Sequence, residues 1–374
     1  MYRICSKLYE NNELLDENME TFGIRTLSVD PKHGFCVNGK TVKLRGSCIH
    51  HDSGILGAAT FYDAEYRRVR MLKEAGFNAI RMAHHPAASA LLRACDELGM
   101  YVMDEAFDMW QRCKSDHDYG LFFDECWEKD VEAMVRKDFN HPCVVMYSIG
   151  NEIPEIGTDH GAKMCHDISE KIKESDPTRY TLASINGIFA ASDVIQGIVA
   201  ELLNEQEAAG EISGDVNNFM AVMDANTDKI VVHNEITKRL DKACAYTDIA
   251  GYNYMTARYE LDGRIRPNRV IVGSETYPPA IAKNWELVES LDHVIGDFTW
   301  TGWDYLREAG IGVPAYQFGE GGFSAVYPCM LAYCGDIDIT GHRRPASYYR
   351  EIVFGLRQTP YIAVQNPYQY GKPS

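Results

Sequence analysis

The chain carries the sequence VVMYSIGNE at residues 144–152, an apolar run that ends in a glutamate. A second run, VIVGSE at residues 270–275, ends in the same way. Short apolar runs bounded by glycine predict buried strands of a parallel sheet. In α/β enzymes the chemistry lies beyond the carboxyl ends of such strands, where both glutamates fall. The two runs therefore predict one catalytic face that carries Glu152 and Glu275.

The same alternation of strand and helix extends along most of the chain. The predicted strands cover residues 42–49, 77–83, 100–103, 143–149, 180–183, 247–252, 270–273 and 294–300. Amphipathic helical segments separate most of them, and each strand ends in polar or aromatic residues. Eight strands in this pattern predict an α/β fold with a parallel sheet, most simply a closed (β/α)8 TIM barrel.

Two regions depart from this alternation. Residues 184–246 form a long excursion with an acidic stretch at 201–228, and we expect it to be helical and to line the cleft. Residues 303–344 are rich in glycine and aromatic side chains, which is typical of an active-site loop.

Composition limits the class of partner. The chain of 374 residues is 45% apolar and 24% charged, as expected for a globular protein. A net charge of -17 argues against nucleic acid as a partner. No apolar run reaches the length of a membrane span, so we expect no membrane partner. Eleven cysteines without a C-x-x-C motif are typical of reduced thiols, which predicts a cytoplasmic location.

Glu152 and Glu275 are the candidate catalytic residues. Two carboxyl groups are the minimum equipment for cleaving a glycosidic bond, and a retaining enzyme needs them about 5–5.5 Å apart. The fourth and seventh strands of a barrel face each other across its mouth, so this separation is within reach. Gly150 and Gly273 allow the sharp turns that follow the two strands. The alternative is that each glutamate is a solvated loop acid.

Short motifs follow one another in a fixed order along the barrel. They are LRG (44–46) leading to His50, IRMAHHP (80–86), DEA (104–106), NHP (140–142), SIGNE (148–152), GYNY (251–254), GSE (273–275) and DFTW (297–300). In order and spacing they resemble the catalytic barrel of glycoside hydrolase family 2, in particular its β-galactosidases. The resemblance extends from about Phe22 to Leu356.

The resemblance implies a domain organisation. Residues 28–357 would be the glycoside hydrolase TIM-barrel catalytic domain, and residues 1–27 the C-terminal remnant of an immunoglobulin-like β-sandwich. Residues 358–374 would be a linker towards a further C-terminal domain. Relatives carry an N-terminal sugar-binding domain that contributes to the pocket, so we expect such a domain to complete the site. A homo-oligomer is left open.

The resemblance also implies catalytic roles. Glu152 would be the general acid/base and Glu275 the nucleophile of a double displacement that cleaves terminal β-linked sugars. Arg81 would keep Glu275 ionised. Tyr254 would donate a hydrogen bond to Glu275 and lie near the ring oxygen of the sugar.

Five further residues are candidates for binding the sugar, and two of them, His50 and His84, match positions that contact it in the family. His50 and His84 would contact its hydroxyl groups, and Asn151 would hold a hydroxyl beside the acid. Trp300 would form the floor against which a pyranose stacks. Asp104 would line the sugar site or brace neighbouring loops. For each histidine the alternative is a structural hydrogen-bonding role.

The chain departs from the metal-dependent members of the family. Those members carry Glu-x-His after the Asp-Glu-Ala motif, whereas this chain has Met109 and Gln111 at the two positions. Methionine is a poor ligand for magnesium, so we predict no metal and no cofactor. The adjacent histidine pairs could suggest a zinc hydrolase, but no H-E-x-x-H motif accompanies them.

The sequence defines the identity of the sugar less narrowly than it defines the type of reaction. Members that cleave glucuronides carry Asn-x-Lys beyond the last strand, and nothing similar follows Trp300 here. A neutral sugar, galactose first, is therefore expected, with β-glucuronidase and β-mannosidase as alternatives within the family. The alternative from another class is a non-catalytic carbohydrate-binding barrel.

Overall fold

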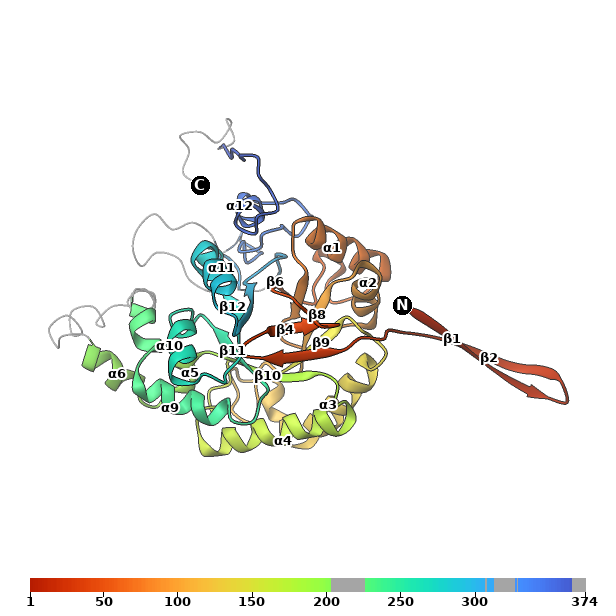
Figure 1. The fold of residues 1–374 in the computed structure, drawn as a ribbon, viewed down its shortest axis with the longest axis horizontal. Helices are drawn as coiled ribbons and strands as arrows, with labels where there is room; N and C mark the ends of the chain where they lie inside the picture. The colour runs from red at the N-terminus through yellow and green to blue at the C-terminus, as the bar shows by residue number, and fades with distance from the viewer. Residues whose placement is uncertain (203–225, 307, 313–326, 328, 365–374) are drawn as a thin grey trace.

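Eight parallel strands close into a barrel in the computed structural model, which describes residues 1–202, 226–306, 308–312, 327 and 329–364 (Figure 1). Around the barrel run β6 (Leu44–Ile49), β7 (Ala79–Met82), β8 (Tyr101–Glu105), β9 (Val144–Asn151), β10 (Tyr180–Ile185), β11 (Ile249–Asn253), β12 (Ile271–Thr276) and β13 (Val294–Thr299), which pairs with β6. The predicted (β/α)8 barrel is confirmed.

Helices cover the outside of the barrel (Figure 1). They are α1 (Tyr62–Glu74), α2 (Ser89–Leu98), α3 (Phe123–Asp138), α4 (Asp159–Ser175), α5 (Gly187–Ala190), α6 (Ile195–Leu202), α9 (Asn234–Ala243), α10 (Arg258–Ile265), α11 (Ile281–Ser290) and α12 (Pro345–Val353). Each long helix buries an apolar stripe; in α2 the stripe includes Leu91, Leu92 and Cys95. Gly99 then ends α2 in the left-handed conformation.

The strands alternate between the two faces of the sheet. In β7, Ile80 and Met82 join the core beneath the helices, whereas Ala79 joins the core inside the barrel. Gly46 of β6 leaves room for the ring of Phe298, because a Cβ atom there would lie 2.2 Å from that ring. The interior at the amino ends of the strands is therefore packed and apolar, and the network around Arg81, Glu105 and Asn151 lies towards the carboxyl ends.

A small antiparallel sheet packs against the amino end of the barrel. It consists of β3 (Leu27–Asp30), β4 (Gly34–Val37) and β5 (Lys40–Thr41). Phe35 of β4 is fully buried and belongs to the interior core. This sheet closes the lower end, so the carboxyl end is the accessible one.

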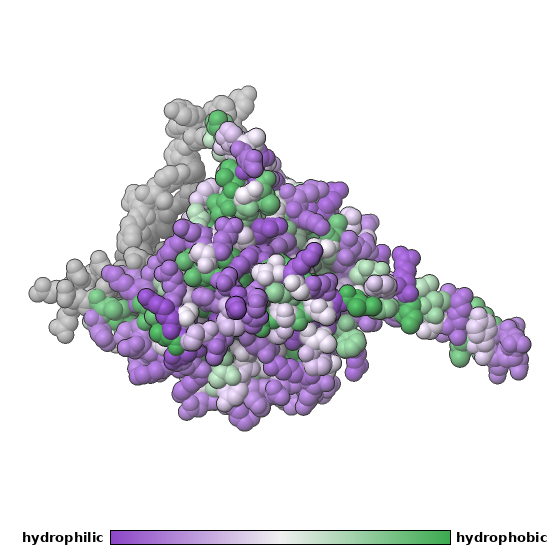
Figure 2. Space-filling view, in the orientation of Figure 1, coloured by the Kyte–Doolittle hydropathy of each residue, from purple (hydrophilic) through white to green (hydrophobic). Residues whose placement is uncertain are grey.

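The hairpin of β1 (Tyr2–Glu10) and β2 (Glu13–Phe22) extends away from the barrel (Figure 1). Its residues are almost all exposed, and apolar and polar side chains are mixed along it (Figure 2). The assignment of residues 1–27 to an immunoglobulin-like domain stays a prediction.

The two irregular regions are described in part. Within 184–246 the structure has α5, α6 and α9, which agrees with the helical character expected there. Residues 203–225 lie outside the described part. Within 303–344 the described residues form turns and isolated bridges, and residues 307, 313–326 and 328 lie outside it. In the described ranges, no helix combines the length and the apolar character needed to cross a membrane.

Candidate active site

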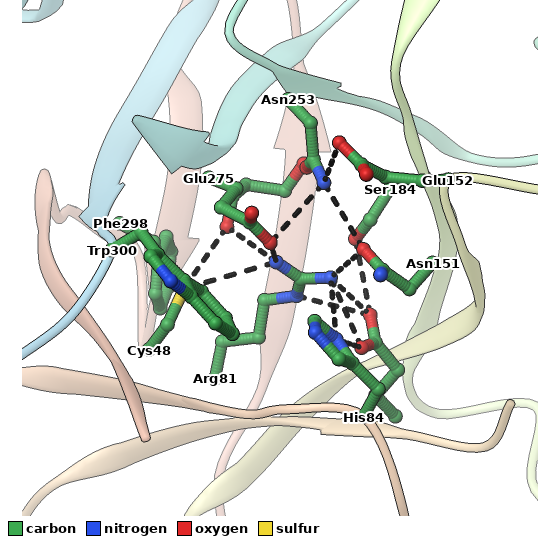
Figure 3. A network of polar contacts seen from close by, with 12 residues as sticks. Cys48, Arg81, His84, Asn151, Glu152, Ser184, Asn253, Glu275, Phe298 and Trp300 are labelled. Atoms are coloured by element: carbon green, nitrogen blue, oxygen red, sulfur yellow. Dashed lines mark hydrogen bonds and ion pairs between the residues drawn. The ribbon is translucent and has the colours of Figure 1, made fainter. Parts of the chain in front are cut away.

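Glu152 and Glu275 lie together at the carboxyl end of the barrel (Figure 3). Glu275 is in β12, and Glu152 follows β9 directly. Glu152 has a φ of 46° and Tyr254, just after β11, a φ of 58°. Positive φ is uncommon for residues with side chains and occurs where the surrounding structure imposes it, often at functional sites. Both turns direct polar side chains into the mouth.

Asn253 connects the two carboxylates. Its Nδ2 lies 3.3 Å from Oε1 of Glu152 and 3.3 Å from Oε2 of Glu275. These two oxygens are therefore separated by at most twice that distance. This upper limit admits the separation of about 5–5.5 Å in retaining glycosidases and falls at the lower edge of the roughly 6.5–9.5 Å range of inverting ones.

Two donors besides Asn253 hold Glu275. The hydroxyl of Tyr254 donates to Oε1 at 2.6 Å, and Nη1 of Arg81 donates to Oε2 at 2.8 Å. Burial opposes the charge of Arg81, but Glu105 and Glu275 outweigh it and hold the pKa of Arg81 well above its usual value. Burial and the neighbouring carboxylates also hold the pKa of Tyr254 well above its usual range. Arg81 therefore stays a cation and Tyr254 a donor.

Glu152 has a different environment. Burial, and then the charge of Glu275, raise its pKa to about 7. Asn186, after β10, donates to Oε1 of Glu152 at 2.9 Å. A carboxyl that holds its proton near neutral pH can act as an acid, while a neighbour held by a cation serves as the nucleophile.

Glu105 organises the opposite side of Arg81. It accepts hydrogen bonds from Nε and Nη2 of Arg81 at 2.8–3.0 Å, and from Ser148 at 2.5 Å. His84 Nδ1 lies 2.7 Å from its Oε1. Burial alone would raise the pKa of Glu105, but Arg81 and its other partners lower it to about 2. The buried guanidinium is therefore fixed between two carboxylates (Figure 3).

Aromatic rings form one wall of the site. The ring of His84 stacks on that of Trp300 with an interplanar angle of 2° and a centroid distance of 5.2 Å. His50 lies edge-on to both, at 5.6 and 5.2 Å. Trp300 Nε1 donates to the hydroxyl of Tyr305 at 3.0 Å, which fixes the indole. This wall suits the apolar face of a pyranose.

Asn151 links this network to the loop after β8. Its Oδ1 accepts from Arg81 Nη2 at 2.8 Å and from Asn253 Nδ2 at 3.1 Å. Its Nδ2 donates to Asp108 at 3.0 Å. The structure thus brings together all but one of the residues expected from the sequence: Glu152, Glu275, His50, Arg81, His84, Asn151, Tyr254 and Trp300.

Asp104 is the exception: of the two roles considered for it, its contacts agree with bracing the neighbouring segments and not with lining the sugar site. Its carboxylate accepts from the backbone N–H of Ala87 at 2.8 Å and from Lys137 at 3.2 Å. The side chain is fully buried outside the barrel. Because successive residues of a strand point to opposite faces, Glu105 takes the inward position and Asp104 braces the neighbouring segments.

Sequence analysis did not identify Asn253 and Asn186 as site residues. Asn253 lies within the motif GYNY, at the carboxyl end of β11. Asn186 directly follows β10. Both follow the rule that polar residues at the carboxyl ends of barrel strands belong to the site, and applying this rule to every strand would have found them.

Met109 and Gln111, where the chain departs from the metal-dependent members, lie apart from the carboxylates of Glu152 and Glu275. Met109 is buried, and the Gln111 side chain pairs with Asp124 and His160. Elsewhere in the described residues, Asp96, His141 and Cys143 place ligand atoms within 4.8 Å of one another. Each already has a hydrogen-bond partner in the protein. That no metal is required stays a prediction.

Comparison with known proteins identifies the barrel. Residues 29–246 match the TIM barrel domain of glycosyl hydrolases family 2. The chain is 30% identical to the "Beta-galactosidase BoGH2A" of Bacteroides ovatus over 93% of its length and 43% of the relative. It is 27% identical to a "Putative beta-glucuronidase" of Formosa agariphila, over 93% of the chain and 32% of the relative.

Solved structures agree with this result. A glycosyl hydrolase family 2 member from Bacteroides cellulosilyticus superimposes with a TM-score of 0.75 and 37% identity, over 93% of this chain and 38% of that one. The β-glucuronidase of Bacteroides uniformis shares the fold, with a TM-score of 0.66 and 18% identity over 95% of this chain and 40% of that one. The chain spans less than half the length of these relatives. Because the family match covers more than half of the chain, the chain belongs to glycosyl hydrolase family 2 and contains its TIM-barrel domain.

Proposed function

We propose that the barrel is the catalytic domain of a retaining exo-β-glycosidase, with a terminal β-galactoside as the first expected substrate. The observation that carries the proposal is the pair of carboxylates bridged by Asn253. Arg81 and Tyr254 hold Glu275, while burial favours a proton on Glu152. The pair therefore has the asymmetry that a double displacement needs.

In the first step a carboxylate oxygen of Glu275 attacks the anomeric carbon. The glycosidic bond breaks, and Glu152 gives its proton to the departing oxygen. In the second step water loses a proton to Glu152, and its oxygen attacks the anomeric carbon. The ester bond to Glu275 breaks, and the free sugar leaves with its original β configuration.

The choice of sugar rests on the relatives and on the residues that follow Trp300, where a lysine would pair with the carboxylate of a glucuronide. The relative named as a β-galactosidase and one named as a putative β-glucuronidase match the same share of the chain. No lysine follows Trp300 in an Asn-x-Lys pattern. Galactosides are therefore expected before glucuronides, and glucuronides before mannosides.

The test is hydrolysis of a panel of nitrophenyl β-glycosides by the 374-residue chain. The panel contains the galactoside, glucuronide, mannoside and glucoside, and NMR identifies the anomer released first. We expect release of β-galactose. Turnover restricted to the glucuronide would overturn the sugar assignment, and release of the α-anomer would overturn the retaining mechanism.

The pH dependence should report the proton on Glu152. Below its pKa of about 7 Glu152 is protonated and can act as the acid; above it the proton is lost. We therefore expect kcat/KM for a glycoside with a poor leaving group to fall as the pH rises through about 7. A dinitrophenyl glycoside, whose leaving group needs no proton, should fall less. An alkaline limb near pH 5 would contradict the assignment.

A further inference from the structure

Lys114 lies in the loop between β8 and α3, next to the segment that carries Glu152. Its Nζ donates to the backbone oxygen of Asn151 at 2.8 Å, one residue before Glu152. The same ammonium pairs with Asp108 at 2.9 Å, and Asp108 in turn accepts from the side chain of Asn151. Lys114 and Asp108 therefore hold Asn151 by both its backbone and its side chain.

The loop presents Lys114 in a fixed conformation. Asp118 accepts from the backbone N–H groups of Lys114 at 2.6 Å, Ser115 at 2.8 Å and Gly120 at 2.9 Å. The Lys114 side chain is 25% exposed, although a lysine at a surface normally keeps its ammonium in water. The ammonium of Lys114 is instead partly buried and has two oxygen partners, which indicates that it holds the segments that carry them.

We propose that Lys114 is a positioning residue of the acid/base: it ties the loop after β8 to the backbone preceding Glu152 and brings a positive charge to the residue next to that glutamate. This inference rests on the proposed function and adds to it, because it assigns a group that opposes the effect of burial and of Glu275 on the proton of Glu152.

The charged and titratable groups near Glu152 come from several elements. Lys114 of the loop after β8, Tyr254 after β11 and Glu275 of β12 act on its carboxyl. Arg81 of β7, Glu105 of β8 and Asp108 belong to the network around Asn151 and Glu275. Arg81 is already shared between Glu105 and Glu275. Burial and Glu275 raise the pKa of Glu152, whereas Asn186, Lys114 and Asn253 act in the opposite direction. Removing the charge of Lys114 should therefore strengthen the hold of Glu152 on its proton.

The first test reads the proton directly and does not depend on turnover. Glutamate labelled with ¹³C at the carboxyl is incorporated into the whole chain, and the resonance that disappears in Glu152→Gln is that of Glu152. We expect its titration to move upward by roughly 0.5 to 1 pH unit in Lys114→Met and Lys114→Gln. Lys114→Arg, which keeps the charge, should titrate close to the parent.

The second test follows the consequence for catalysis. The alkaline limb of kcat/KM should move upward in the two neutral variants by the same amount as the NMR titration. Lys171→Met is the matched control, since Lys171 also pairs with a single carboxylate, at 2.6 Å from Glu132, on the outer helices. A titration that is unchanged or lowered in both neutral variants, or an equal rise in Lys171→Met, would overturn the inference. A parent chain that hydrolyses none of the glycosides would leave the kinetic test without a readout, while the NMR titration would still decide the role of Lys114.

Discussion

Replacing Glu275 by glutamine is expected to reduce turnover by about 10⁴- to 10⁶-fold, the usual range for loss of a catalytic nucleophile. Glutamine keeps the volume of the side chain but cannot form the ester with the anomeric carbon. Glu275 is nearly buried and contacts Arg81, Asn253 and Tyr254, so the variant should fold but lose the covalent step. The measurement is kcat on the best substrate of the glycoside panel.

Two controls make this result specific. Glu286→Gln changes an exposed glutamate of α11 and should keep the parental kcat. A fluorinated slow substrate should add the mass of one sugar to the peptide that contains Glu275, in the parent but not in the variant. Retention of activity within about tenfold would show that Glu275 is not the nucleophile.

The same variant separates an enzyme from a binding module. A non-catalytic barrel would show no turnover in the parent and would bind galactose equally well before and after the change. A glycosidase should instead lose turnover and retain binding. Turnover by the parent therefore distinguishes the two, and calorimetric titration with galactose checks that the variant still binds the sugar.

The barrel could be predicted from the sequence because each of its strands and helices has a recognisable pattern within a short stretch of residues. Each strand is a short apolar run, and each helix a separate stripe, so the eight repeats could be recognised one at a time. Glu152 and Glu275 could be identified for the same reason, because each follows such a run. Their mutual contact depends on barrel closure, which the count of strands implies.

Side-chain direction was harder to predict. Asp104 and Glu105 are adjacent and both acidic, so composition does not show which one faces inward. The register of β8 against β7 decides it, since Met103 lies opposite Arg81. Pairing is also irregular near Asn253 and Ser184, where register shifts interrupt the alternation. Alternation of inward and outward side chains, counted from the start of a strand, therefore does not predict side-chain direction where the site begins.

Contacts between segments that are distant in the sequence could not be recognised from any local sequence pattern. Asn253 of β11 joins Asn151 and Glu152, at the end of β9, to Glu275 of β12. Lys114 lies in a loop without periodicity, and its backbone partner is the last residue of β9. Such contacts follow from the closed barrel and become visible only when the chain is folded.

Replacing Arg81 by methionine is expected to cost both stability and activity. Arg81 is completely buried and is ion-paired to Glu105 and Glu275 at 2.8 Å each. Methionine fills much of the space but leaves both carboxylates buried without their cation. Breaking a buried ion pair in this way typically costs about 3–5 kcal/mol of unfolding free energy, and losing the electrostatic support of the site about 10²- to 10³-fold in kcat. Denaturant unfolding and kcat measure the two effects.

A second buried arginine separates the two effects. Arg258 is also fully buried, with its ion pair to Asp262 in α10, away from the catalytic carboxylates. Arg258→Met should lose comparable stability but keep kcat in the folded fraction. In the double variant Arg81→Met/Glu105→Gln, about 0.5–3 kcal/mol of stability should return, because one unpaired carboxylate is gone. Activity should not return, since Glu275 still lacks its cation. Full activity in Arg81→Met, or equal loss of kcat in Arg258→Met, would show that Arg81 supports the fold and not the nucleophile.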